Sequence, residues 1–169
     1  IEDNGFSDGA DLYERFERVF PLAYEEDVDA RRGAADLKQV DAMLNGTPTP
    51  LSDYQLELGA KQETESVVFR VFRKDNPIAL SDVLPLLENL GMRVISERPY
   101  QLRTVTPFWI QEFELEPPAG TTHKTLRNNR YQFAESFALQ LSGAIESDGL
   151  NKLIAATELD SRDVSLLRT

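Results

Sequence analysis

The sequence contains no cysteine, one histidine and one tryptophan, and it has no long apolar run. Without cysteine it can form neither a disulfide nor a thiol nucleophile nor a cysteine-based metal site. The single histidine, His123, lies in a polar stretch without partner residues, so we expect a solvated loop residue rather than a catalytic or metal-binding one. No segment has the length of a membrane span or the pattern of a charged leader.

The motifs of common catalytic sites are also missing. The sequence has no GxGxxG or GxxxxGK[ST] phosphate loop and no GxSxG nucleophile motif. Glu25, Glu26, Asp27 and Asp29 form an acidic cluster where a metal site is conceivable. We prefer the explanation that acids favour helix N-termini because of the helix dipole. The sequence therefore predicts no catalytic, cofactor-binding or metal-binding residues.

Acidic side chains outnumber basic ones by 29 to 18, which gives a net charge of −11. Such a surface repels nucleic-acid phosphates and anionic lipids, so we expect neither nucleic acid nor membrane as a partner. Hydrophobic residues make up 41% of the chain, enough for a packed core. The absence of cysteine fits a reducing compartment, and we expect a cytoplasmic protein.

The first fifty residues have helical periodicity. Residues 8–20 carry apolar side chains at helical spacing, and Pro21 ends that helix. Residues 24–45 predict a second helical stretch, with Asn45 and Gly46 as its C-terminal cap. The segment TPTP at 47–50 then breaks the helix.

The middle of the chain changes to strand periodicity. YQLEL at 54–58 alternates and predicts an edge strand, whereas VVFRVF at 67–72 is almost continuously apolar and predicts a central one. Ser81 is expected to cap a helix that ends at Gly91 and leads into a third strand. PFWIQEFEL at 107–115 completes an antiparallel hairpin, and helices follow from 121 onward.

This order predicts an α+β fold: a four-stranded antiparallel sheet with helices on one face, plus flanking helices. It corresponds to a ferredoxin-like βαββαβ unit whose first strand has moved to the end of the chain. The helices around Leu37 and Leu87 are expected to cover the buried face, and the terminal helices to pack elsewhere. We expect an N-terminal helical segment at 1–50, an α+β core at 51–120 and C-terminal helices at 121–169.

The turn before the helix at 79–90 resembles that of ACT domains, small modules that often bind amino acids and regulate enzymes. Asp75, Asn76, Pro77 and Ile78 occupy the turn, and apolar residues and a closing glycine follow at the family's offsets: Leu80, Val83, Leu87 and Gly91. The resemblance implies that residues 75–78 form an effector turn. Ile78 replaces the glycine that usually lets the backbone approach a ligand. We therefore favour subunit contacts over effector binding.

A second resemblance covers most of the chain. Four blocks in order resemble the middle part of the large bacterial NAD-dependent glutamate dehydrogenases: FPLAYEEDVDARRGAADL, PIALSDVLPLLENLGMRVISERPY, WIQEFEL and FAESFALQLSGAIESDGLNKLIAATELDSRDVSLLR. The resemblance implies the last ACT-like domain and the first helices that lead toward a catalytic domain beyond residue 169. The catalytic domain of the family oxidises L-glutamate to 2-oxoglutarate and ammonia with NAD. No residue here matches a catalytic motif, so NAD is expected in the parent enzyme and no cofactor in this part.

The leading hypothesis is a non-catalytic regulatory or scaffolding region of such a dehydrogenase. Its expected partners are other domains of the same chain and further copies, through ACT-like contacts in a homo-oligomer. The chain starts at Ile1 without methionine and ends inside a helical pattern, so we expect a piece of a longer protein. The alternative is a free-standing amino-acid-binding ACT domain. An independent small enzyme is the third hypothesis, and the lack of a catalytic grouping disfavours it.

Overall fold

The fold is known from a computed structural model, which describes residues 9–46, 54–58 and 67–147. The helices predicted after Asp148 lie outside these residues. The described elements follow one another as α1 (Gly9–Val19), α2 (Leu22–Asp27), α3 (Ala30–Leu44), β1 (Tyr54–Leu58), β2 (Val67–Lys74), α4 (Leu80–Asn89), β3 (Arg93–Leu102), β4 (Phe108–Glu116) and α5 (His123–Leu141).

The strands form one antiparallel sheet. β2, β4 and β3 pair side by side, and β1 pairs with the other side of β2, giving the order β1-β2-β4-β3. The predicted edge strand at 54–58 and central strand at 67–72 are therefore confirmed. β3 and β4 form the predicted hairpin, and the α+β class is confirmed.

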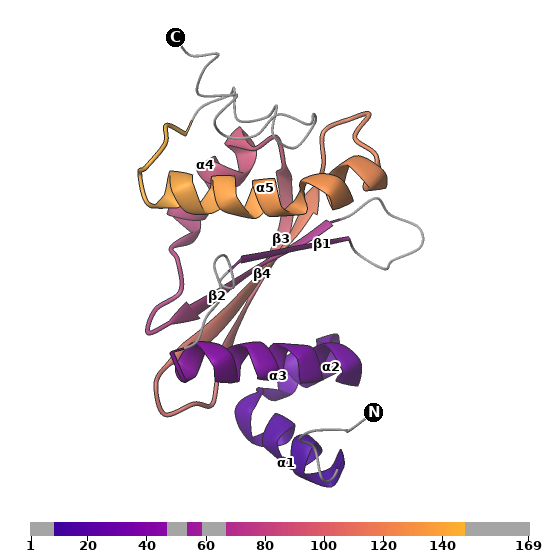
Figure 1. The fold of residues 1–169 in the computed structure, drawn as a ribbon, viewed down its shortest axis with the longest axis vertical. Helices are drawn as coiled ribbons and strands as arrows, with labels where there is room; N and C mark the ends of the chain where they lie inside the picture. The colour runs from indigo at the N-terminus through magenta and orange to yellow at the C-terminus, as the bar shows by residue number, and fades with distance from the viewer. Residues whose placement is uncertain (1–8, 47–53, 59–66, 148–169) are drawn as a thin grey trace.

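Helices cover both faces of the sheet. α4 and α5 lie on one side, and α1, α2 and α3 lie on the other (Figure 1). The prediction of helices on one face is thus wrong. The reason lies in β2 and β4, whose alternate residues are apolar on both faces: Phe69 and Phe113 point toward α4 and α5, while Phe72 and Ile110 point toward α3. A strand buried on both faces has a nearly continuous apolar sequence, and such a sheet needs two covering layers.

The pairing of helices on the sheet also differs from the prediction. Leu87 of α4 belongs to one core, whereas Leu37 of α3 belongs to the core on the opposite face. The place beside α4 is taken by α5, whose Phe133 and Phe137 are almost fully buried. The expectation that the helix after residue 121 packs away from the sheet is therefore wrong as well.

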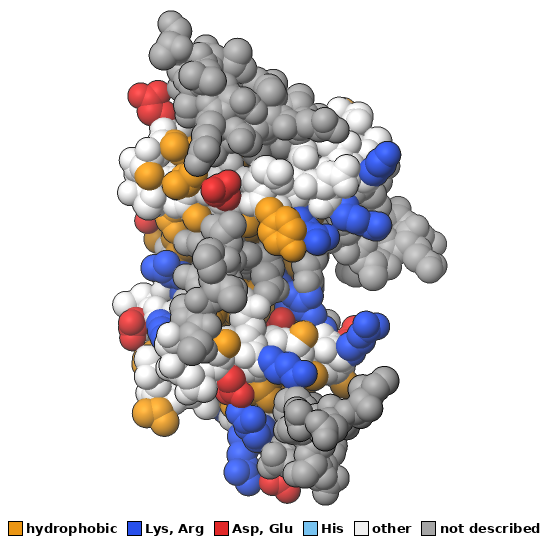
Figure 2. Space-filling view, viewed as in Figure 1, with side chains coloured by type: hydrophobic (Ala, Val, Ile, Leu, Met, Phe, Trp, Pro, Cys, Tyr) orange, Lys and Arg blue, Asp and Glu red, His pale blue; other side chains and the backbone are white. Residues whose placement is uncertain are grey.

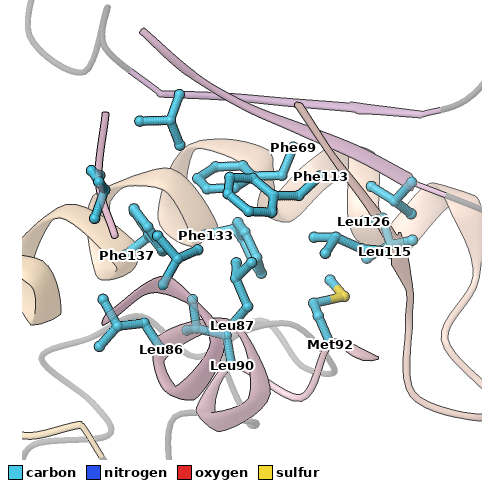
Figure 3. Packing of buried hydrophobic residues seen from close by; sticks show 14 residues of the cluster. Phe69, Leu86, Leu87, Leu90, Met92, Phe113, Leu115, Leu126, Phe133 and Phe137 are labelled. Atoms are coloured by element: carbon cyan, nitrogen blue, oxygen red, sulfur yellow. The ribbon is translucent and has the colours of Figure 1, made fainter. Parts of the chain in front are cut away.

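The first core lies between the sheet and the helices α4 and α5 (Figure 3). Phe69 of β2 lies at its centre, with its ring edge-to-face against Phe133 and Phe137 at centroid distances of 5.3 and 4.8 Å. Aromatic pairs favour this geometry because the ring edge is positive and the ring face is negative. Leucines of α4 and α5 and Met92 surround the rings.

The second core joins the helical layer α1–α3 to the opposite face of the sheet. Phe20 stacks on Tyr24 at 4.2 Å between centroids, and Tyr24 meets Tyr100 of β3 edge-on at 5.2 Å. Gly33 of α3 allows α1 to come close, since a Cβ there would lie 2.1 Å from Cε2 of Phe16. Residues far apart in sequence therefore share one interior.

The helical stretch predicted at 24–45 is two helices, not one. Val28 has extended backbone angles, and α3 starts after Asp29. The Asp29 carboxylate accepts a 2.8 Å hydrogen bond from the backbone N–H of Arg32, so it caps α3 and ends the continuity of the helix. Gly46 has a φ of 76° and follows α3, as the predicted cap requires.

Two other local predictions need correction. Ser81 does not cap α4, which begins at Leu80 with Ala79 at the N-cap and no side-chain cap. His123 is the first residue of α5 rather than a loop residue, because Thr122 accepts a hydrogen bond from the N–H of Thr125 and caps the helix one residue earlier. Within the described part of the chain, no helix combines the length and apolar character needed to cross a bilayer.

Candidate functional site

The predicted effector turn connects β2 to α4 and is held against the β3–β4 hairpin. Asp75 has a φ of 68°, in the left-handed region that aspartate tolerates better than most residues. Its backbone N–H donates to the carbonyl of Pro107 at 2.8 Å, and the N–H of Asn76 donates to the carbonyl of Lys74 at 2.9 Å. The structure therefore keeps Asp75, Asn76, Pro77 and Ile78 together in one ordered turn.

The backbone N–H and C=O of Ile78 are both hydrogen-bonded to a side chain of the sheet. Gln111 of β4 accepts from the N–H of Ile78 at 2.8 Å through Oε1 and donates to the carbonyl of Ile78 at 2.9 Å through Nε2. Gln111 itself is only 2% exposed. One carboxamide thus satisfies both backbone polar groups of the residue that stands in place of the family's glycine. Neither group is left free to bind a ligand.

The side chain of Ile78 points into the protein. It is 9% exposed and belongs to the first core. Its role in the structure is to fix the turn on that core. Effector binding by residues 75–78 stays a prediction. Sequence reasoning missed Gln111, and the available signal was a polar residue in a strand with apolar neighbours, since a buried amide needs partners.

Replacing Gln111 by alanine is expected to destabilise the protein by about 1–3 kcal/mol, because the N–H and C=O of Ile78 would lose their partners in a buried place. Hydrogen exchange of the Ile78 amide should accelerate in the same variant. Urea unfolding and exchange mass spectrometry measure the two effects. Gln101→Ala, on the exposed side of β3, serves as the control, and unchanged exchange at Ile78 in Gln111→Ala would contradict the assignment.

A buried charge network lies on the opposite face of the sheet. Asp36 of α3 is 1% exposed and Arg70 of β2 is 4% exposed. Oδ2 of Asp36 accepts hydrogen bonds from the hydroxyl of Tyr24 and from the Arg70 guanidinium. The network joins the helical layer to a central strand of the sheet.

Two further charges complete this network. Nε of Arg32 lies 3.1 Å from Oδ1 of Asp36. The Arg70 guanidinium also reaches Glu112 of β4, with Nε and Nη2 at 2.9 and 2.7 Å from Oε2. Two carboxylates thus face two guanidinium groups, and buried charges are tolerated only when they are paired in this way.

The surroundings fix the charge state of these groups. Burial lowers the pKa of Arg70, but the carboxylates of Asp36 and Glu112 outweigh burial and leave its pKa raised. Burial first, and then the charge of Asp36, raises the pKa of the Tyr24 phenol well above its usual range. Tyr24 is therefore a neutral hydrogen-bond donor at neutral pH.

Further contacts tie the helical layer to β3. The hydroxyl of Tyr100 donates to Oδ2 of Asp27 at 2.8 Å, and Nη1 of Arg98 lies 2.8 Å from Oδ1 of the same carboxylate. The backbone N–H of Arg103 donates to the carbonyl of Val19 at 2.7 Å. Residues of the helical layer are thus bonded to β2 and β3, and the network reaches β4 through Arg70.

The sequence indicated only part of this site. Arg32 pairs with Asp36 of its own helix. Asp36 was not singled out, although it stands beside Leu37 in an otherwise apolar stretch of α3. Tyr100 lies in the second core at 4% exposure.

The turn and the charge network described above can stabilise the fold. Each charge of the network is opposed by one of the other sign, and neither turn nor network holds a nucleophile next to a general base. Among the described side chains, no three acids or histidines gather into a metal-binding group. The arrangement fixes the position of a helical layer on a sheet.

Comparison with known families divides the chain between the N-terminal helical layer and the sheet. A family model described as "Glutamate dehydrogenase, ACT3 domain" matches residues 45–128, which contain the sheet and α4. One described as "Glutamate dehydrogenase, helical motif 2" matches residues 1–43, which contain α1 and α2 and nearly all of α3. The chain is therefore an ACT-domain protein with an N-terminal helical motif. It belongs to the glutamate dehydrogenase family, as the sequence blocks predicted.

Individual relatives agree with this assignment. Over 99% of its length the chain is 38% identical to the NAD-specific glutamate dehydrogenase of Halomonas elongata and 32% identical to that of Pseudomonas aeruginosa. It is 27% identical over 89% of its length to the enzyme of the same name from Mycobacterium tuberculosis. The chain spans about a tenth of the length of these relatives. It matches their non-catalytic ACT and helical regions.

Proposed function

We propose that this region is a scaffold that holds helical motif 2 and the ACT3 domain as one rigid element within a glutamate dehydrogenase. The observation that carries this proposal is the Asp36–Arg70–Glu112 network, which joins α3 to two strands inside a shared core. An interface built only for transient regulation would be expected to be smaller and wetter. A buried, fully paired network instead favours one fixed geometry.

The activity proposed for the whole protein is the oxidation of L-glutamate to 2-oxoglutarate and ammonia with reduction of NAD, a step of amino-acid catabolism in the cytoplasm. The printed names of the relatives, which are NAD-specific glutamate dehydrogenases, support this proposal. NAD would bind in another part of the parent enzyme. The region described here would act by positioning that part and by contacts between copies in a homo-oligomer.

We infer that the sheet and its helices α4 and α5 form a permuted ACT-like unit of four strands. The strand order and the antiparallel pairing support this inference. In the unpermuted βαββαβ unit the first and last strands are neighbours, so a hairpin such as β3–β4 can join them. The first helix then follows its strand to the end of the unit, which is the position of α5.

The division into 1–50, 51–120 and 121–169 stays a proposal, with one addition. α5 contributes Leu126, Phe133 and Phe137 to the first core, so we place residues 123–141 with the α+β core in function.

Contacts rather than effector binding are proposed for the turn at residues 75–78. Ile78 fills the position of the ligand-side glycine, and Gln111 already uses its N–H and C=O. The free-standing amino-acid sensor gains no support from the matches, since both matched regions are parts of glutamate dehydrogenases.

Isothermal titration calorimetry tests the scaffold proposal directly. The purified chain is expected to show no binding heat with NAD or with L-glutamate, while the full-length protein binds NAD. A panel of the other amino acids in a thermal-shift assay addresses the sensor alternative. Saturable binding of NAD or glutamate to the chain would contradict the scaffold, and a shift with one amino acid would favour the sensor.

A further inference from the structure

The N-terminal half of α5 carries an exposed basic and aromatic face. Lys124, Arg127 and Arg130 lie in its first three turns, and the first turn contains no acid. The N-terminus of a helix is the positive end of its dipole, so cations there cost stability and acids would increase it. Basic residues at the N-terminal end of a helix therefore suggest a compensating interaction with a partner.

This face is exposed and available. Tyr131 is 64% exposed, and the Arg130 guanidinium lies 4.8 Å from the centroid of its ring. Within the described ranges, no carboxylate forms an ion pair with Lys124, Arg127 or Arg130. Figure 2 shows lysine and arginine side chains along one half of α5, beside a hydrophobic side chain. Arginine and tyrosine are among the residues enriched at protein interfaces.

A complementary face lies on α2. Leu22, Glu25 and Glu26 follow one another at i, i+3 and i+4, so they share one side of the helix. Leu22 is 63% exposed, which is unusual for a large apolar side chain. The face thus offers one apolar contact flanked by two carboxylates, the chemical counterpart of Tyr131 flanked by Arg127 and Arg130.

The two faces cannot meet within one molecule. α2 and α5 pack on opposite faces of the sheet (Figure 1). A contact between them therefore joins two copies, and it is heterologous because it uses different surfaces on the two partners.

We propose that the basic and aromatic face of α5 in one copy docks on the acidic face of α2 in the next copy of the parent protein. The inference rests on the proposed scaffold function and names the surface through which the scaffold joins copies. Tyr131 packs on Leu22, while Arg127 and Arg130 pair with Glu25 and Glu26. Such pairs at an interface rim are screened by salt, so the association is ionic-strength dependent.

Charge reversal in the full-length protein tests the proposal. Arg127→Glu with Arg130→Glu, and separately Glu25→Arg with Glu26→Arg, are each expected to weaken self-association at least about tenfold, since like charges would then face each other. Combining all four substitutions in one chain should restore association, because every pair is again of opposite sign. Sedimentation velocity in low and high salt measures the assembly.

The control is Arg31→Glu with Lys74→Glu, which changes the net charge by the same amount as the reversal on α5 but on exposed residues elsewhere. Loss of assembly that the four-fold variant does not restore would overturn the pairing and indicate an acidic partner other than α2. Unchanged assembly in both reversal variants would overturn the docking surface altogether. Glutamate oxidation by the unmodified protein is measured alongside, so that failure of the proposed parent activity is recognised separately.

Discussion

Replacing Arg70 by methionine is expected to lower the free energy of unfolding by about 3–5 kcal/mol, because one partner of a buried ion pair is lost. Asp36 would remain buried at 1% exposure with a carboxylate opposed only by Arg32. Glu112 would lose two short bonds from the same guanidinium. Methionine has a similar length and is apolar, so the effect reports the lost charge rather than a large cavity.

Urea unfolding followed by far-ultraviolet circular dichroism measures this change. Arg18→Met is the matched control, since Arg18 pairs with Glu14 on the surface with a side chain that is 77% exposed. Exposed pairs contribute little, so the control should change stability by less than about 1 kcal/mol. Equal effects of the two substitutions would mean that the network does not fasten the helical layer to the sheet.

Replacing Phe69 by alanine is expected to destabilise the protein by about 3–5 kcal/mol through loss of buried apolar area and creation of a cavity. Phe69 is fully buried on a central strand, and its ring meets Phe133 and Phe137 of α5. The cavity would open between β2 and α5, so α5 should lose protection against hydrogen exchange more than α3.

The same unfolding experiment measures the effect, with Tyr13→Ala as control. Tyr13 is an aromatic residue that is 61% exposed, so its removal creates no cavity. If exchange increased in α3 and not in α5, the assignment of α5 to this face of the sheet would be wrong.

Local sequence signals predicted the elements well because the forces behind them are local. The cap at Asn45 and Gly46, the stop at Gly91 and the periodicity of 67–72 depend on residues within one or two turns. The break at Val28 and Asp29 was missed because Asp29 continues an acidic run, and its capping role shows only in its bond to Arg32. Helical periodicity across the break hid the change of direction.

The layer arrangement needed information that the local patterns do not carry. α3 and α5 are both amphipathic, and the sequence alone does not tell which of them shares a face with α4. The sequence of β2 indicates that both faces of the sheet are covered, because β2 is apolar on both faces and requires two covering layers. Gln111 and Asp36 were likewise invisible as partners because Ile78 and Arg70 are 33 and 34 residues away.

The adjacent residues Gln111 and Glu112 influence the register in which β4 pairs with its neighbouring strands. Their side chains point to opposite faces of the sheet, one to the turn at Ile78 and the other to Arg70. If β4 slipped by one residue, the carboxylate would enter the apolar core and the amide would face the charges. The two polar side chains therefore act as a check on strand register, penalising misaligned sheets during folding.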